Sequence, residues 1–533
     1  MKKLYFGGSI LTMDKSAPRA EAVLTEDGWI LAVGTYDELF TPEAELVDLG
    51  GRTLMPGFVD GHSHMVGVGT NLMQNCDLMG CTGFDDMLDR IRRFREEKKL
   101  FNGQPIRARG YDLAIMKEGK NPTAALLDSL GFDNPIGCIH LSGHTGAYST
   151  AAMRAVGIDD ETYVCPEGGY AERDENGKLT GYFEETAKNV FGDLFNSNLS
   201  VDEMAEVALA AQEHYVKHGF TTVQDGGGNL AKKVAIMEKL TSEGKLKVDT
   251  VVYMSSKPDK HELVKETFEK YGGKYTGHFK VGGVKLVLDG SPQARTAWMT
   301  KPYEGESEYC AYPIMTDEEV EERLTLAAEI GAQPLAHCNG DAASEQFVSV
   351  WEKLLREGKA TPSLRPMMVH CQTVTEPQIK RMAASGMLAS VFVGHCFFWG
   401  DTHLKNFGPI RGNNISPLRT MLDHGVVPNL HQDSPVTEPD MLHSIWCAVN
   451  RRTRSGVTVG EHQKIDVYDA LIAATRGGAY VYFEEDTKGI LKAGAQADFV
   501  VLSDDPTAVE PMTIKDIEVL KTIKNDEVLY SAE

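Results

Sequence analysis

Two histidines separated by one residue follow a short apolar run near the start of the chain, where residues 56–64 read PGFVDGHSH. In an extended strand, alternate side chains share a face, so Asp60, His62 and His64 point to the same side. Two imidazoles on one face can chelate one divalent metal ion, and zinc accepts imidazole nitrogen well. Taken alone, such a pair is more often two surface histidines in a loop, so its meaning depends on what the rest of the chain supplies.

Three residues that could complete a metal site end apolar runs later in the chain. His337 closes the run QPLAH, His370 closes PMMVH, and Asp433 follows NLHQ. A single histidine at such a position is usually a core residue with a satisfied hydrogen bond, and an aspartate before Ser-Pro can simply form a turn or cap a helix. Their occurrence together with His62 and His64 favours a shared site. There Asp433 would take a proton from water and return it to a leaving group.

A lysine lies inside a run that otherwise predicts a buried strand. Lys285 occurs in GVKLVLDGS, residues 283–291, with valine and leucine beside it. A buried ammonium group costs free energy unless it is neutralised or paired. Carboxylation by CO₂ would convert it to an anionic carbamate that can bridge two metal ions. The plain alternatives are a lysine whose side chain reaches solvent, or one that pairs with Asp289 on the same face.

The composition is that of an ordinary globular chain of 533 residues, 42% of them hydrophobic and 25% charged. The net charge of -23 argues against nucleic acid and anionic membranes as partners, because both attract basic proteins. The nine cysteines are scattered and form no CxxC pair, which suits a reducing compartment. We expect no secretion signal at the start of the sequence, and the most apolar window, residues 386–400, is too short to span a bilayer. These features predict a cytoplasmic protein.

Apolar runs between residues 56 and 480 alternate with amphipathic helical stretches, which is typical of a parallel α/β architecture. Eight such runs match the strands of a (β/α)8 TIM barrel, whose active site lies at the C-terminal ends of the strands. The runs are residues 57–60, 135–141, 221–225, 281–289, 332–337, 365–370, 387–395 and 426–433. The helices expected between them include residues 201–218, 317–330, 342–356 and 377–385.

Both ends of the chain read as short strands separated by Gly and Asp turns. Neither end has enough strands to bury a core alone. We therefore expect residues 1–55 and 484–533 to form one small β-sandwich domain, with the barrel at residues 56–483. The expected strands are residues 4–6, 22–24, 29–33, 46–49, 498–503, 517–523 and 527–530.

The interval of about 65–215 does not follow the compact strand–helix pattern seen later in the chain. It contains the apolar runs 106–111 and 135–141 and the helical stretches 84–98 and 184–195. We expect much of it to be an insertion after the first barrel strand, covering the barrel mouth.

Together these motifs carry a resemblance that runs nearly end to end. The chain resembles the metal-dependent amidohydrolase superfamily and, within it, the branch called amidohydrolase family 3, the YtcJ-like enzymes. These motifs together are highly specific for the family, although no single motif would be. The motifs are MPGFVDGHSH at 55–64, SGH at 142–144, KLVLDGS at 285–291, RTA at 295–297, HCNGD at 337–341, HCQ at 370–372, DSPV at 433–436, KGI at 488–490 and GAQADFVVL at 494–502.

The resemblance implies a (β/α)8 barrel with a β-sandwich formed by both termini, and one or two divalent metal ions, usually zinc. It also implies a role for each motif residue. His144 stands where this branch has a histidine that faces the substrate and could polarise its carbonyl group. The implied metal ligands are His62 and His64 on strand 1, carboxylated Lys285 on strand 4, His337 on strand 5, His370 on strand 6 and the acid/base Asp433 on strand 8.

Two features depart from the family pattern near the expected pocket. Gln432 replaces the usual small residue before Asp433, and the aromatic cluster at 397–399 is unusual. Aromatic residues near strand ends indicate either an apolar or aryl substrate group or ordinary packing of loops. The residues expected to bind substrate are His144, Asp289, His431, Trp298 and Phe398.

The implied reaction is hydrolysis of a C–N bond in a small amide-like substrate, such as an N-acyl or N-formyl compound, by metal-activated water. Deamination of a cyclic amidine and opening of a cyclic amide remain alternatives that would use the same residues. A binding scaffold without catalysis is a further alternative, which is disfavoured because every ligand position is filled. The family also leads us to expect a homodimer.

Overall fold

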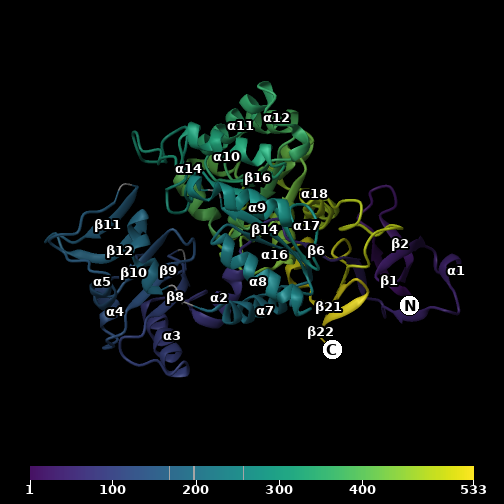
Figure 1. Cartoon of the computed structure of the whole chain (residues 1–533), viewed down its shortest axis with the longest axis horizontal. Helices are drawn as coiled ribbons and strands as arrows, with labels where there is room; N and C mark the ends of the chain where they lie inside the picture. The colour runs from purple at the N-terminus through teal and green to yellow at the C-terminus, as the bar shows by residue number, and fades with distance from the viewer. Residues whose placement is uncertain (114, 167, 196–198, 256, 533) are drawn as a thin grey trace. The chain divides into compact units, whose positions relative to one another are not determined.

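The computed structural model describes every residue except 114, 167, 196–198, 256 and 533. The chain divides into two compact units, and each is described by itself (Figure 1). The larger unit contains Met1–Val66 and Ala208–Glu533, and the smaller contains Gly67–Val207.

The larger unit is built around a sheet of eight parallel strands in TIM-barrel-like order. Neighbouring strands follow one another along the chain, and helices connect them, as parallel pairing requires. The strands are β6 (Phe58–Val59), β13 (Phe220–Gly226), β14 (Asp249–Ser255), β15 (Phe279–Val287), β16 (Gln333–Cys338), β17 (Met367–His370), β18 (Leu388–Val391) and β19 (Pro428–Leu430).

The prediction of the barrel strands was wrong at one position. Residues 135–141 do not join the barrel sheet, because β9 (Ile136–His140) pairs with β8 and β10 in the smaller unit. The third barrel strand is instead β14, which pairs with β13 and β15. Both segments are short and apolar, so their sequences cannot distinguish which sheet each one joins.

The first and last barrel strands approach each other closely beyond their ends. A Cβ atom on Gly61 would lie only 1.7 Å from the side-chain oxygen of Asn429, so only glycine fits there. The backbone N–H of His64 donates to the carbonyl oxygen of Ser434 at 2.8 Å. These two contacts bring the segment that follows β6 against β19 itself, at Asn429, and against the residues that follow β19, at Ser434.

Helices between the strands begin where the sequence supplies capping residues. Thr316 forms a capping box with Glu319 at the start of α10, and Thr375 does the same with Gln378 at the start of α12. The helices of this part of the chain are α7 (Val201–Lys217), α8 (Leu230–Ser242), α9 (His261–Tyr271), α10 (Asp317–Glu329), α11 (Asp341–Arg356), α12 (Glu376–Ala384), α13 (His395–Phe398), α14 (Gly400–Gly412), α15 (Leu418–Asp423), α16 (Met441–Asn450), α17 (Val467–Ala474) and α18 (Arg476–Val481).

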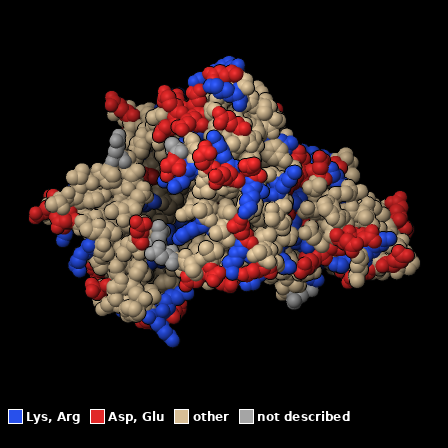
Figure 2. Space-filling model, in the orientation of Figure 1, with Lys and Arg blue, Asp and Glu red and all other residues tan. Residues whose placement is uncertain are grey.

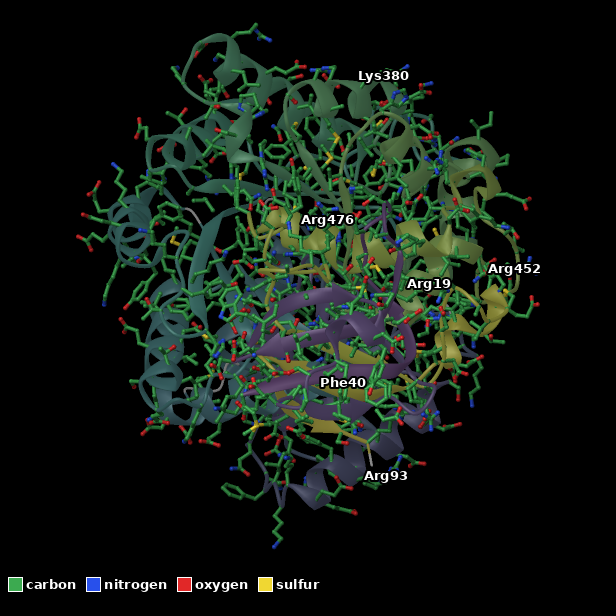
Figure 3. The ribbon with its side chains drawn as sticks, turned by 90° about the vertical axis from the view of Figure 1, so that its right-hand side faces the viewer. Arg19, Phe40, Arg93, Lys380, Arg452 and Arg476 are labelled. Carbon is green, nitrogen blue, oxygen red and sulfur yellow. The ribbon has the colours of Figure 1, made fainter. Side chains whose placement is uncertain are left out.

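The two ends of the chain meet in a second sheet of eight strands. Its centre is the antiparallel pair of β5 (Thr53–Pro56) and β20 (Phe499–Leu502), and Figure 3 shows the N-terminal strands beside the C-terminal ones. Leu54, Phe499 and Val501 are buried in its core. The other strands are β1 (Lys2–Leu11), β2 (Arg19–Glu26), β3 (Trp29–Gly34), β4 (Glu45–Asp48), β21 (Val519–Lys524) and β22 (Glu527–Ser531).

A buried group of charges joins this terminal sheet to the barrel. The Asp249 carboxylate at the start of β14 accepts from Lys488 at 2.5 Å and from Lys524 of β21 at 2.6 Å. Asp498 provides Lys524 with a second carboxylate at 2.6 Å. The group is almost free of solvent contact, so each charge depends on its partners.

The smaller unit contains a six-stranded sheet of its own. A helix was expected at residues 184–195, but the chain continues as strand to Glu185, forms a 3₁₀ turn at Thr186–Phe191 and ends in the single turn α6 (Gly192–Phe195). The other elements are β7 (Cys76–Asp77), β8 (Ile106–Tyr111), β9, β10 (Thr145–Tyr148), β11 (Gly169–Arg173), β12 (Leu179–Glu185), α3 (Phe84–Glu97), α4 (Ala124–Asp128) and α5 (Thr150–Ala155).

Acidic and basic side chains are interspersed over the face of the molecule shown in Figure 2. Among the described residues, every helix is too short or too polar to cross a bilayer.

Candidate metal centre

The polar residues singled out in the sequence lie at the C-terminal ends of the barrel strands. His62 and His64 follow β6, and Asp433 follows β19. His337 lies near the end of β16, and His370 is the last residue of β17. In a parallel sheet these ends share one edge, so residues distant in sequence can reach a common point.

His62, His64 and Asp433 form the most compact group of potential ligands. The Nε2 atoms of both histidines lie 3.4 Å from Oδ1 of Asp433. One ligand atom from each of the three residues lies within 4.8 Å of the others. Imidazole nitrogen and carboxylate oxygen are both ordinary ligands of zinc and related divalent ions.

Two hydrogen bonds orient the histidine rings. Nδ1–H of His62 donates to the side-chain oxygen of Gln224, and Nδ1–H of His64 donates to the carbonyl oxygen of Gly226 at 2.6 Å. Each bond fixes the tautomer in which Nε2 carries a free lone pair. Both lone pairs belong to the atoms nearest Asp433. The backbone and side chain at the end of β13 therefore act as supports for the candidate ligands.

His337 and His370 form a second pair on the other side of Asp433. Nδ1 of His337 lies 3.0 Å from Nε2 of His370, which is 4.0 Å from Oδ2 of Asp433. Nε2 of His337 lies 3.1 Å from the carbonyl oxygen of Gly290, and this contact leaves Nδ1 as the lone-pair nitrogen. The carboxylate thus lies between two pairs of imidazoles.

Lys285 is buried in β15 with its amine directed at the first histidine pair. Its Nζ lies 2.9 Å from Nε2 of His62. Burial lowers the pKa of Lys285 to about 8. The lysine thus belongs to the same cluster as the histidines and the aspartate.

The surroundings of His62, His370 and Asp433 favour the protonation states that metal binding needs. Burial, followed by the effect of Lys285, lowers the pKa of His62 well below its usual value. Burial, followed by the effect of His337, does the same for His370. Burial alone would raise the pKa of Asp433, but the neighbouring His64, His370 and His62 hold it well below its usual range. His62 and His370 are therefore favoured as neutral imidazoles, and Asp433 as a carboxylate.

This donor set fits a divalent metal ion. Within the described part of the chain, Oδ1 of Asp433 and Nδ1 of His370 are buried without a hydrogen-bond partner. A buried carboxylate oxygen without a partner is costly unless it binds a cation.

His144 belongs to the smaller unit and is held by an acidic residue. Its Nδ1 lies 3.0 and 3.1 Å from the two carboxylate oxygens of Glu185 at the end of β12. Nδ1–H therefore donates to Glu185, and Nε2 is left to act as an acceptor, or as a donor when the ring is protonated. The role of Glu185 had no signal in the sequence, because it lies in a stretch that predicted a helix.

The four other residues expected to bind substrate have different surroundings. The carboxylate of Asp289 accepts backbone N–H groups of Trp298 at 3.1 Å, Asn339 at 2.9 Å and Gly340 at 2.7 Å, which indicates that it positions loops. His431 is buried, and its ring centroid lies 5.4 Å from that of His62 and 5.2 Å from that of His370.

The side chain of Trp298 is half-buried, and its backbone carbonyl accepts from Ala342. Phe398 packs against His443, and the guanidinium of Arg454 lies 5.0 Å from its ring. Two of these four thus reach the ligand cluster: His431 through its ring contacts, and Asp289 through Oδ1, which lies 3.5 Å from Nε2 of His337.

Sequence reasoning missed Gln224 and Gly226 as supports of the histidines. The apolar run 221–225 did mark the end of a barrel strand, and polar residues at such ends are candidates for the site. However, a glutamine inside an apolar run has no recognisable spacing relative to His62, so only the fold reveals its partner.

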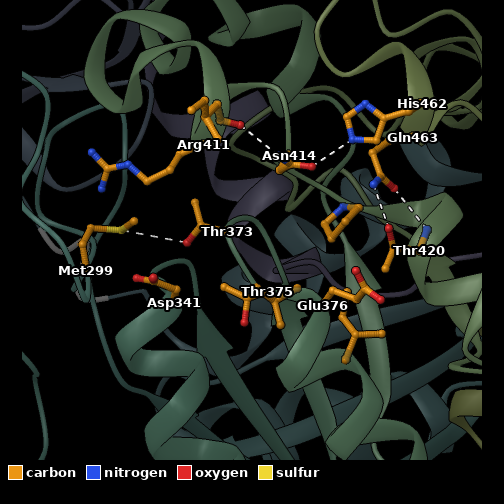
Figure 4. Close-up of a pocket in the computed structure, with 14 residues that line it drawn as sticks. Met299, Asp341, Thr373, Thr375, Glu376, Arg411, Asn414, Thr420, His462 and Gln463 are labelled. Atoms are coloured by element: carbon orange, nitrogen blue, oxygen red, sulfur yellow. Dashed lines mark hydrogen bonds between the residues drawn. The ribbon is translucent and has the colours of Figure 1, made fainter.

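A separate pocket of about 400 Å³ lies near the start of α12 (Figure 4). Its lining includes Asp341, Thr375, Arg411 and His462, and among the described residues it includes none of the candidate metal ligands. Its polar groups bond to one another or to nearby backbone, for example His462 to Asn414 at 2.8 Å. This pocket is therefore not the metal centre.

Comparisons with known proteins agree with this geometry. The model of the Amidohydrolase family matches residues 45–530. YtcJ of Bacillus subtilis (strain 168), named as an amidohydrolase, is 28% identical, with 99% of each chain covered. The N-substituted formamide deformylase of Arthrobacter pascens is 26% identical, covering 99% of this chain and 98% of that protein.

A solved structure of an uncharacterized metal-dependent hydrolase from Pyrococcus horikoshii OT3 shares the fold. It has a TM-score of 0.75 and 23% identity, covering 96% of this chain and 99% of the other. The family match spans the barrel, the strands β4 and β5 from the N-terminal part of the terminal sheet, and the strands of its C-terminal part. The chain therefore belongs to the amidohydrolase family and is a hydrolase that acts on carbon–nitrogen bonds.

Proposed function

We propose that this protein hydrolyses the C–N bond of a small amide-like substrate, of the N-acyl or N-formyl class. The observation that carries the proposal is the position of Asp433 between the pairs His62/His64 and His337/His370. The similarity to a protein named N-substituted formamide deformylase supports the N-formyl class within it.

One or two divalent ions would be held by these residues, and zinc is our first choice because the nitrogen and carboxylate donors suit it. When bound, such an ion supplies Lewis-acid activation of water near neutral pH. Lys285 would contribute as a carbamate, which removes a buried positive charge from beside His62 and supplies oxygen donors to a second ion.

The residues of the chain then divide the remaining work. Asp433, with one carboxylate oxygen lacking a hydrogen-bond partner among the described residues, would accept the proton of the attacking water and pass it to the departing nitrogen. His144, oriented by Glu185, would donate a hydrogen bond to the substrate oxygen as negative charge develops there.

The substrate pocket would be bounded by His431, which lies next to the ligands. Trp298 and Phe398 would supply its apolar surface. Asp289 would hold the loop that carries Trp298.

We further propose that the terminal sheet folds as a β-sandwich and that much of the interval 65–215 covers the barrel mouth. In the same proposal, the protein works in the cytoplasm as a homodimer on a small molecule, without nucleic acid or membrane partners.

The test is a substrate panel with the zinc-loaded protein. N-formyl and N-acyl amines, cyclic amides and cyclic amidines would be incubated separately. We expect release of a free amine together with formate or another carboxylic acid. Release of ammonia together with the corresponding carbonyl compound would favour the deaminase alternative, and a ring-opened acid would favour the cyclic amidase. Failure to turn over any compound, with metal bound, would contradict the proposal and favour a binding scaffold.

A further inference from the structure

A second group of potential metal ligands lies away from the candidate centre. His214 lies in the last turn of α7 and His218 directly after its end, four residues on; Glu438 lies in the segment between β19 and α16. One ligand atom from each residue lies within 4.8 Å of the others. Residues four apart on a helix face the same side, so the two imidazoles can serve one ion.

The hydrogen bonds of this group prepare it for a cation. Nδ1 of His218 lies 2.7 Å from the carbonyl oxygen of His214, to which Nδ1–H donates. This bond fixes the tautomer in which Nε2 of His218 carries the lone pair. Nε2 of His214 lies 2.6 Å from Oε2 of Glu438, and the two imidazole rings are 4.7 Å apart. Two nitrogens and one carboxylate oxygen thus converge from two separate segments.

We propose that His214, His218 and Glu438 form a second divalent-cation site, of the zinc class, with solvent as the fourth ligand. Two histidines and a glutamate with an open position are a known ligand set for zinc. Tetrahedral zinc with bonds of about 2.0–2.1 Å needs its ligand atoms roughly 3.3 Å apart, so small side-chain rotations within the 4.8 Å limit suffice.

An ion at this position would connect α7 to the segment that carries the acid/base. Glu438 follows Asp433 by five residues, and between them Ser434 accepts the N–H of His64 at 2.8 Å. The Ser434 carbonyl thus links this segment to the first candidate ligand pair. A cation bound by Glu438 would restrain the far end of the segment without contacting the candidate centre itself.

A matched pair of variants tests the site. His218→Gln removes one proposed ligand, while His424→Gln removes a histidine that makes an ordinary two-residue contact with Glu376 at 3.1 Å. Each protein would be saturated with zinc, desalted and assayed for zinc per chain. We expect His218→Gln to hold one zinc fewer than the unaltered protein, and His424→Gln to hold the same number. Equal zinc in all three proteins would overturn the proposal.

Two additions separate this site from the candidate centre and from folding defects. In a His62→Asn background, adding His218→Gln should lower the zinc content by one further ion per chain, whether or not the first centre still binds zinc. Glu438→Gln changes an exposed side chain, so it should fold normally and also lose one zinc. Zinc should raise the melting temperature of the unaltered protein more than that of Glu438→Gln; an equal rise would count against the site.

Discussion

Nε2 of His62 lies 3.4 Å from Oδ1 of Asp433, although the two residues follow the first and the last strands of the barrel sheet. This contact depends on the close approach of the two segments at Gly61 and Asn429. The candidate centre is therefore a product of how the sheet curls, and its geometry is sensitive to residues that support either strand.

Replacing Asp433 by asparagine should separate metal binding from turnover. We expect the Asp433→Asn variant to retain bound metal through its histidines while turnover falls by about 10²–10⁴-fold, the usual size of a general acid–base contribution. Steady-state kinetics and elemental analysis on the same preparation measure both. Asp423→Asn, which alters an exposed aspartate paired with Arg419, is the control. Near-normal turnover in Asp433→Asn would refute its acid/base role.

Gln224 should influence metal affinity although it is not a ligand. Gln224→Leu removes the acceptor that fixes the His62 tautomer, so we expect metal affinity to fall by about 10–100-fold. Gln224→Glu keeps an acceptor at the same position and should recover much of the loss. Metal titration of the apo-proteins distinguishes them. If Gln224→Leu and Gln224→Glu lowered metal affinity equally, the orientation of His62 would not explain the loss.

Lys285 should carry a carbamate if the centre holds two ions. Protein prepared in ¹³C-bicarbonate should show a carbamate carbon resonance, and Lys285→Met should lose that resonance together with one of two metal ions per chain. Lys280→Met is unsuitable as a control, because Lys280 is itself buried beside Glu484. Lys380→Met instead removes an exposed lysine that pairs with Glu376 at 2.8 Å and should keep the resonance. If the resonance persisted in Lys285→Met, the carbamate would lie on a residue other than Lys285.

The buried charges at Asp249 should make stability depend on acidity. Burial alone would raise the pKa of Asp249, but Lys488 and Lys524 hold it well below its usual value. A carboxyl group with a lowered pKa stabilises the fold above its unfolded pKa of about 4 and loses that contribution as the pH falls through its folded value.

Asp249→Asn should therefore destabilise the protein by about 3 kcal/mol at pH 7, because two buried ammonium groups each lose one of their two carboxylate partners. The difference from the unaltered protein should narrow as the pH is lowered below about 4, because Asp249 of the unfolded chain takes up a proton there while the folded protein keeps it ionised until a lower pH. Denaturant titration across this pH range measures the effect. A difference that stays constant with pH would show that Asp249 acts through packing and not through charge.

The sequence by itself determined which residues could do the chemistry. The spacing of His62 and His64, the apolar runs that end at His337 and His370, and the lysine inside a buried run each follow from side-chain type and strand periodicity, which are local properties. The capping residues Thr316 and Thr375 likewise specify where helices begin. Family membership followed from the joint pattern of these motifs.

Only the tertiary structure decided which runs share a sheet and which residues meet. Strand β14 and strand β9 have similar short apolar sequences, and their long-range pairing alone assigns one to the barrel and the other to the smaller unit. The contact of His62 with Gln224, and that of His214 with Glu438, likewise join segments far apart in the chain. Such pairings depend on chain packing, which no local pattern of residues records.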